Sequence, residues 1–286
     1  MSTRQQRTIA RPVLVEGVGL FGGADVRMSL LPAEANSGLI FERVDLPGRP
    51  RVPARMNYLV HQPRRTVLER RTARVEMVEH VLAALAGLWI DNCLIQLDAL
   101  EPPVGDGSAL EIVEALLYAG IAEQQVMQAQ FPVTGELKVS TPGERGSMQA
   151  HRSDSYTIRY DLDYGQTVIP PQSFTATITP EEFVREIAFA RTFVLESEVA
   201  LLKARGYGLR ATTQNLLVFG PQGVIDNTLR APDECARHKL LDCIGDLALC
   251  GGSPVGRFHA IQSGHHLNHR MVENLVGANP PLRKSA

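Results

Sequence analysis

Short apolar runs separated by Gly, Pro and Asn recur along the first third of the chain. Residues 13–20 lead into a Gly22-Gly23 turn, after which Val26, Met28 and Leu30 alternate with polar neighbours, a period of two that is typical of a strand with one buried face. On this pattern we expect strands at residues 13–20, 26–30, 39–41 and 93–97. The first half of the chain is therefore predicted to be rich in β-structure.

A period of three to four residues replaces this alternation at several places and predicts helices. The expected helices cover residues 75–88, 110–118, 235–249 and 267–275, and further strands are expected between residues 137 and 178. A polar, Gln-rich connector near residues 124–134 separates two halves in which strands precede a helix. Segregated strands and helices favour an α+β fold over a wound parallel sheet. We expect two similar domains, residues 1–126 and 127–286.

Composition narrows the possible functions. The 286 residues include 29 basic and 31 acidic side chains, and aromatic residues make up 6%, so neither a nucleic-acid partner nor a base-stacking surface is expected. No run approaches the roughly 20 apolar residues that span a bilayer, and no signal peptide is expected. The four cysteines form no Cys-x-x-Cys pair, which favours reduced thiols in the cytoplasm over a zinc ribbon or disulfides.

Candidate chemistry is concentrated on one face of the helix expected at residues 235–249. His238, Asp242 and Asp246 follow one another at intervals of four residues and therefore share that face. An imidazole and two carboxylates among Leu, Ile and Cys residues are costly to bury without compensation. A bound cation would supply it.

Two further clusters could complete such a site: Glu79-His80, and the turn 263–269, which contains His265. Two imidazoles, one carboxylate and an open position form a common catalytic zinc shell, which suggests hydrolysis of an amide by metal-bound water. A neighbouring Glu can accept the water proton, and a His can protonate the leaving amine. Each cluster alone also fits a plainer interpretation: an exposed polar edge, a local hydrogen bond across one helical turn, or a helix cap.

Several motifs, in order, resemble those of the UDP-3-O-acyl-N-acetylglucosamine deacetylases, zinc amidases that commit the cell to lipid A synthesis. They are Gly17-Val18-Gly19-Leu20, residues 78–85, Asp106-Gly107-Ser108-Ala109, Ala190-Arg191-Thr192-Phe193, Arg237-His238-Lys239 and Ser263-Gly264-His265. The resemblance runs from about Thr8 to Leu275. It implies two α+β domains, each a sheet layer, with helices packed between the two halves as a β-α-α-β sandwich. The active site would lie where the domains meet.

The resemblance also implies roles for individual residues. It makes His80, His238 and Asp242 the ligands of Zn2+. It makes Glu79 the general base and His265, in preference to His266 by motif register, the general acid. The remaining implied roles are orientation of the acid by Asp246, support of the oxyanion by Thr192, and substrate binding by Lys239, Phe193, Asp163, Tyr164, Leu20, Val199 and Gln262.

The chain departs from the family pattern at positions that concern the substrate. Phe21 lies where a His is usual, Arg65 where a Cys lies near the acyl entrance, and Gln262 where a Lys precedes Ser-Gly-His. In an insert at about residues 193–220, Arg210-Ala211-Thr212 replaces a Gly-Gly-Ser turn that shapes the acyl passage. These changes bear on acyl-chain length and affinity, and leave the implied ligands, base and acid intact.

Three hypotheses follow. The first is a monomeric cytoplasmic deacetylase of a Gram-negative-type bacterium that releases acetate from the small molecule UDP-3-O-[(R)-3-hydroxyacyl]-N-acetylglucosamine. The second is a related zinc amidase for a different N-acetylated sugar, suggested by Phe21, Gln262 and Arg210. The third is a non-catalytic sugar-nucleotide-binding protein, which would be expected to lack the base or the acid.

Overall fold

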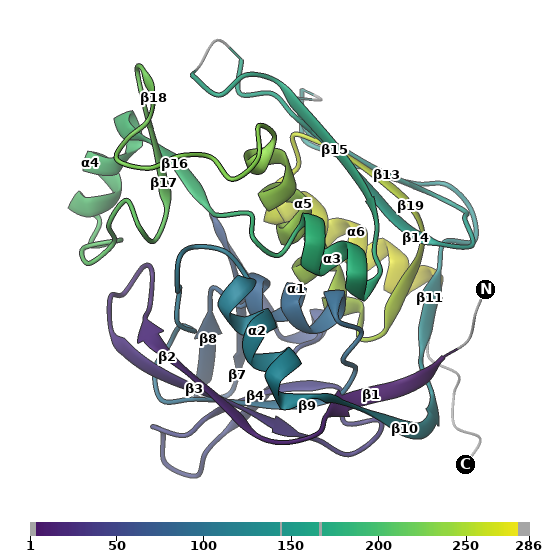
Figure 1. Ribbon diagram of the computed structural model, residues 1–286. Coiled ribbons are helices and arrows are strands. Elements are labelled where there is room, and N and C mark those ends of the chain that lie inside the picture. Colours follow the sequence, from purple (N-terminus) through teal and green to yellow (C-terminus); the bar gives the residue numbers. More distant parts are fainter. Residues whose placement is uncertain (1–3, 144, 166–167, 280–286) are drawn as a thin grey trace.

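Two sheets of the same topology form the outer layers of the molecule (Figure 1). The computed structural model describes residues 4–143, 145–165 and 168–279. The strands of the first sheet are, in spatial order, β2 (Val13–Val18), β3 (Asp25–Pro32), β9 (Cys93–Leu97), β4 (Leu39–Arg43) and β5 (Arg51–Pro53). Those of the second are β12 (Leu137–Ser140), β13 (Ser147–His151), β19 (Ser253–Ile261), β14 (Tyr156–Leu162) and β15 (Gln172–Thr177).

Strands at equivalent positions in the two sheets run in the same direction relative to their neighbours. In each, the last strand along the chain inserts between the second and the third, so that β9 is parallel to β4 and β19 is parallel to β14. The other neighbours along both paths are antiparallel. The predicted similarity of the two halves, which no sequence repeat reveals, therefore holds for the strand order and directions of their main sheets.

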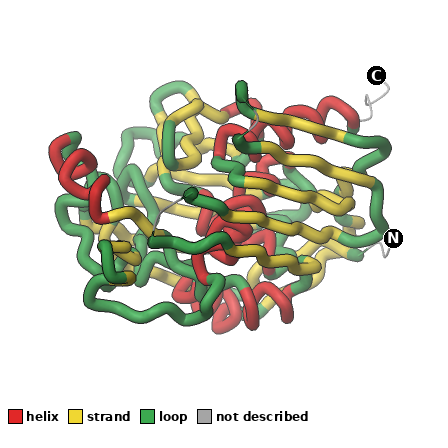
Figure 2. The backbone as a smooth tube through the Cα atoms, turned by 90° about the horizontal axis from the view of Figure 1, so that it is seen from above, coloured by secondary structure: helices red, strands yellow, loops and turns green. Residues whose placement is uncertain are grey.

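Helices fill the space between the two sheets (Figures 1 and 2). They are α1 (Glu79–Gly87), α2 (Leu110–Ala119), α3 (Pro180–Glu186), α5 (Glu234–Leu247) and α6 (His265–Ala278). Helices α1 and α5 pack directly against each other, and their apolar side chains belong to one continuous core. The predicted α+β class is confirmed, and the elements that carry Glu79-His80 and His238 come together at the centre of the molecule.

Three smaller sheets complete the fold. One pairs β1 (Gln5–Ile9) with β10 (Ile121–Met127), the second contains β6 (Leu59–Gln62), β7 (Arg65–Arg70) and β8 (Ala73–Glu76), and the third contains β16 (Phe193–Leu195), β17 (Leu217–Gly220) and β18 (Gly223–Val224). Strand β11 (Gln130–Pro132) runs beside β19, and the 3-10 turns are η1 (Met56–Tyr58) and η2 (Ala248–Cys250). Helix α4 (Glu196–Ala204) and the third sheet project from the main layers (Figure 1).

Two predictions about local structure are wrong. The helix expected from residue 75 begins only at Glu79, because Met77 has a φ of 55°, which a right-handed helix does not allow. Glu79 and His80 thus open the helix instead of lying inside it. The connector expected near residues 124–134 contains β10 and β11. Within the described part of the chain, strand β10 pairs only with β1, and the polar run Glu123-Gln124-Gln125 at its centre hides its strand character.

The close approach of α5 to α1 depends on Gly245. A Cβ atom added there would lie 2.0 Å from the carbonyl oxygen of Glu79, so one backbone would have to move. We expect Gly245→Ala to lower the free energy of unfolding by about 1–3 kcal/mol, as overpacking does. Thermal unfolding would measure this. Gly277→Ala in α6 is the control, because a Cβ atom there meets nothing within 4 Å. Equal unfolding temperatures for the two variants would contradict the prediction.

Candidate active site

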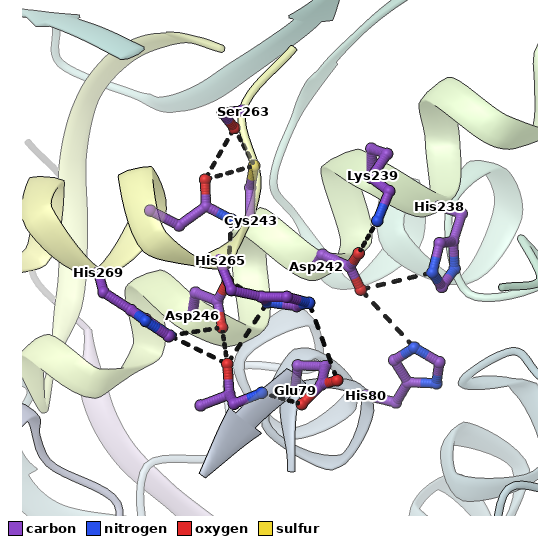
Figure 3. Close-up of polar contacts among 12 residues, drawn as sticks. Glu79, His80, His238, Lys239, Asp242, Cys243, Asp246, Ser263, His265 and His269 are labelled. Atoms are coloured by element: carbon purple, nitrogen blue, oxygen red, sulfur yellow. Dashed lines mark hydrogen bonds and ion pairs between the residues drawn. The ribbon is translucent and has the colours of Figure 1, made fainter. Parts of the chain in front are cut away.

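One carboxylate lies between two imidazoles at the junction of α1 and α5 (Figure 3). The Oδ1 atom of Asp242 is 3.7 Å from Nε2 of His80 and 3.5 Å from Nε2 of His238. The ligand atoms of the three residues all lie within 4.8 Å of one another. Donors in a tetrahedral shell with bonds of about 2 Å are roughly 3–4 Å apart, so this group has the spacing that a zinc-sized ion requires.

The surroundings prepare these side chains to bind a cation. Nδ1–H of His238 donates to the carbonyl of Ala190 at 3.2 Å, which leaves Nε2 free toward Asp242. Burial lowers the pKa of His238 to about 3, so its imidazole is neutral at pH 7. Burial opposes ionisation of Asp242, but His238 and Lys239 outweigh it and hold its pKa well below the usual range. The residues present therefore fit a divalent metal.

Glu79 lies next to this group and is almost completely buried. Its Oε2 accepts the backbone N–H of Thr66 at 3.0 Å, and its Oε1 is 4.0 Å from Nε2 of His265. Burial raises the pKa of Glu79 above its usual value, although the nearby His265 and His80 counteract it. A carboxylate with a raised pKa is a better proton acceptor at neutral pH.

Asp246 does not join the first group; it binds histidines from α6 (Figure 3). Nδ1–H of His265 donates to its Oδ2 at 2.8 Å, and Asn268 donates to the same atom at 2.8 Å. The other oxygen accepts the hydroxyl of Thr66 and lies 3.3 Å from Nε2 of His269. Burial works against a charged His265, but the Asp246 carboxylate outweighs it and raises the pKa of His265 to about 9. His265 is thus protonated at pH 7.

These groups open into a cavity of about 460 Å3 between the two halves. Of the residues that the sequence singles out, its walls contain Glu79, His80, His238, Asp242, His265, Thr192, Phe193, Lys239, Tyr164 and Leu20. Val199 lines an adjoining apolar cavity instead. Asp163 and Gln262 are exposed, and neither is part of the cavity wall. The structure therefore gathers most of the predicted residues but not these two.

Three buried polar residues of the site were not predicted individually. Asn268 and His269 lie in the cluster 263–269 that the sequence marks, whereas Thr66 lies on β7 amid Val67 and Leu68 and carries no local signal. Thr66 nonetheless contacts both Glu79 and Asp246. These contacts join residues far apart in the chain and depend on the tertiary fold, so no local sequence pattern predicts them.

Comparison with known proteins agrees with this geometry. The family described as LpxC, UDP-3-O-acyl N-acetylglycosamine deacetylase, matches residues 6–277. The chain belongs to this deacetylase family. Relatives named UDP-3-O-acyl-N-acetylglucosamine deacetylase include those of Anaeromyxobacter sp. (strain Fw109-5), 36% identical over 96% of this chain and 90% of the relative, and Myxococcus xanthus (strain DK1622), 36% over 96% and 87%. That of Pseudomonas entomophila (strain L48) is 33% identical over 95% and 90%.

The deacetylase family membership covers both halves of the chain, including every element that carries a cavity residue. The resemblance stated from the motifs is thereby confirmed. Among the described residues, none of the helices combines the length and the apolar character needed to cross a bilayer.

Proposed function

We propose that this chain hydrolyses the N-acetyl group of UDP-3-O-[(R)-3-hydroxyacyl]-N-acetylglucosamine and releases acetate, the committed step of lipid A biosynthesis. The observation that carries the proposal is the convergence, in one cavity, of the group His80, His238 and Asp242 with two proton-transfer candidates, Glu79 and His265. The family to which the chain belongs supports the substrate. The non-catalytic alternative loses support, because the base and acid candidates both face the cavity.

We propose Zn2+ as the metal, held by Nε2 of His80, Nε2 of His238 and the carboxylate of Asp242. Two imidazoles and one carboxylate are a ligand set that catalytic zinc sites use. When bound there, zinc supplies Lewis acidity, which polarises a carbonyl and lowers the pKa of coordinated water to about 7. The group Asp246, His265 and His269 is less suited to a cation, because its donors already hydrogen-bond one another and Thr66.

In this proposal the carboxylate of Glu79 accepts the proton of the attacking water, and Nε2–H of His265 protonates the leaving amine. The 4.0 Å between Oε1 of Glu79 and Nε2 of His265 lets one scissile amide contact both. Asp246 keeps His265 charged through Nδ1, and the hydroxyl of Thr192, in the same wall, stabilises the oxyanion.

For the substrate, we propose that Phe193 and Lys239 contact the sugar and diphosphate, that Asp163 and Tyr164 hold uracil, and that Leu20, Val199 and Gln262 make the remaining contacts. Nζ of Lys239 donates to Asp242 at 2.9 Å, so this ammonium steadies a metal ligand and keeps two further donors for phosphate. Tyr164 packs edge-on to Phe193 with ring centroids 5.8 Å apart. Asp163 and Gln262 would have to reach the substrate from outside the cavity wall.

We also propose residues 1–126 and 127–286 as the two domains of a cytoplasmic monomer in a Gram-negative-type bacterium. The matching topology of the two main sheets supports the division. The four cysteines are all free and buried, which suits a reducing compartment.

A deacetylation assay tests the proposed function. Acetate release from the acylated UDP-sugar is expected to stop on chelation and to return when zinc is added. A strong preference for non-nucleotide N-acetyl sugars would favour the related amidase instead. Acetate release unaffected by chelation and by metal depletion would contradict the zinc mechanism.

The pH profile tests the pairing of Asp246 with His265. Without the carboxylate charge, the pKa of His265 should fall from about 9 toward its ordinary 6.5. Because the acid must hold its proton, activity is lost as pH rises through this pKa. We therefore expect Asp246→Asn to move the alkaline limb of kcat/KM to lower pH.

The matched control is Asp161→Asn, which breaks a comparable contact between His259 Nε2 and Asp161 Oδ2 at 2.6 Å, outside the cavity. Its profile should equal that of the wild type. An unmoved alkaline limb in active Asp246→Asn would remove Asp246 from the proposed role.

A further inference from the structure

The sequence motif at residues 106–109 has no part in the proposed chemistry, because none of its residues lines the catalytic cavity. It immediately precedes α2 in the first half of the chain. The motif nevertheless bonds to residues 188–192, which join α3 to β16 in the second half. The N–H of Thr192, at the end of that segment, donates to the carbonyl of Gly107 at 2.8 Å. A turn of the first half therefore contacts a residue of the cavity wall directly.

The same segment is also bonded to α5. Nδ1–H of His238 donates to the carbonyl of Ala190 at 3.2 Å, and the N–H of Arg191 donates to Oε1 of Glu234 at 3.1 Å. Glu234 is completely buried, and its Oε1 also accepts a hydrogen bond from Nε of Arg191 at 2.8 Å. Residues 188–192 are thus fixed relative to the helix that carries the proposed zinc ligand His238.

Two further contacts hold the motif against the segment. Oδ2 of Asp106 accepts a hydrogen bond from Nη2 of Arg230 at 2.5 Å, and Nη1 of the same guanidinium donates to the carbonyl of Phe189 at 2.9 Å. The N–H of Ala109 donates to the carbonyl of Ala188 at 3.0 Å. The turn of the first half is therefore bonded to the start of the segment as well as to its end.

Gly107 can make this contact because it has no side chain. Its φ is 91°, in the region that favours glycine. A Cβ atom added there would lie 2.3 Å from the carbonyl oxygen of Asn215 and 3.4 Å from Cγ2 of Thr192. Asn215 is itself held, since its Nδ2 donates to the carbonyl of Gly105 at 2.7 Å. A larger residue would therefore have to displace the turn, Asn215 or Thr192.

We propose that the motif at residues 106–109 positions Thr192, with the carbonyl of Gly107 and its lack of a side chain as the points of contact. The inference rests on the proposed function, in which the hydroxyl of Thr192 stabilises the oxyanion. Such a donor acts within about 2.7–3.1 Å of the developing charge, so even a small shift of the Thr192 backbone weakens it. A turn of the first half thereby controls an oxyanion donor that belongs to the second half.

A double-mutant cycle on the zinc-loaded enzyme tests this positioning. Thr192→Val lacks the hydroxyl and is expected to lower kcat about 10²- to 10³-fold, the usual loss for one oxyanion donor. Gly107→Ala should lower kcat about tenfold or more, with little change in KM or zinc content. In the Thr192→Val background it should lower kcat by less than about twofold, because the hydroxyl that it displaces is already absent.

Gly48→Ala, in the turn between β4 and β5, is the matched control. Its φ of 76° is also in the left-handed region, and a Cβ atom there meets nothing within 4 Å. This variant should keep the wild-type kcat. If Gly107→Ala does not fold, Arg230→Gln takes its place in the cycle, because it removes the ion pair with Asp106 and adds no bulk.

The methyl resonance of Thr192 gives a reading that needs no turnover. In protein with isotope-labelled threonine methyl groups, this resonance is assigned by its absence from Thr192→Val. It should shift in Gly107→Ala and in Arg230→Gln and stay in place in Gly48→Ala. A shift supports the positioning even if the acylated UDP-sugar is not deacetylated or Thr192→Val keeps full turnover, outcomes that would defeat only the proposed function. An unmoved resonance in both Gly107→Ala and Arg230→Gln, or an equal loss of kcat from Gly107→Ala with and without the Thr192 hydroxyl, would overturn the inference.

Discussion

Asp242→Ala should lose metal and activity together. Asp242 is the carboxylate that lies within 4 Å of Nε2 of both His80 and His238, so its removal leaves two imidazoles with no anionic partner between them. Loss of a residue that only supports a ligand already costs roughly 10- to 100-fold in metal affinity or activity, and loss of the ligand itself should cost more. Zinc content of the purified protein and acetate release would be measured on the same preparation.

Loss of a buried carboxylate also leaves the ammonium of Lys239 without its partner, so folding must be checked separately. Asp242→Asn keeps the shape of the side chain and removes its charge. This variant should show the circular dichroism spectrum of the folded wild type and nevertheless bind zinc poorly. Asp154→Ala, an exposed carboxylate between β13 and β14, is the matched control and should keep both zinc and activity. A folded Asp242→Ala protein with stoichiometric zinc and full turnover would defeat the assignment.

The sequence predicts the helical half of the site well, because four-residue spacing alone places His238, Asp242 and Asp246 on one face. Their separate surroundings could not be predicted in the same way. Asp242 contacts His80 on α1, whereas Asp246, one turn later, contacts His265 on α6. Which helix faces which turn of α5 depends on packing between segments far apart in the chain, and no local pattern carries that information.

Backbone conformation is a second feature that the hydrophobic pattern of the sequence does not predict. The apolar run through residues 75–88 follows a helical period, yet Met77 adopts a left-handed conformation and splits the run into β8 and α1. The break has a consequence for the site, because it places Glu79 and His80 in the first turn of α1, beside Gly245 of α5. The local irregularity that the pattern misses is thus adjacent to the proposed base and a proposed ligand.

Glu79→Gln is expected to lower kcat by about 10²- to 10⁴-fold, the usual contribution of a general base. Glutamine has the same size and keeps an oxygen to accept the backbone N–H of Thr66, so the local structure should be retained. It cannot take a proton from water. KM and zinc content should change little, and single-turnover measurements would locate the loss in the chemical step.

Glu114→Gln on the exposed face of α2 removes the same charge away from the cavity and should leave kcat unchanged. Comparison with Asp242→Ala distinguishes a general base from a metal ligand, because loss of either would abolish activity. A base holds no metal, so Glu79→Gln should remain fully loaded with zinc while nearly inactive. If Glu79→Gln lost its zinc, Glu79 would be a ligand, and if it kept most of its turnover, another group would have to accept the proton. Because Glu79 also helps to raise the pKa of His265, the alkaline limb of Glu79→Gln should shift to lower pH, and its kcat must therefore be compared with that of the wild type at a pH below both limbs.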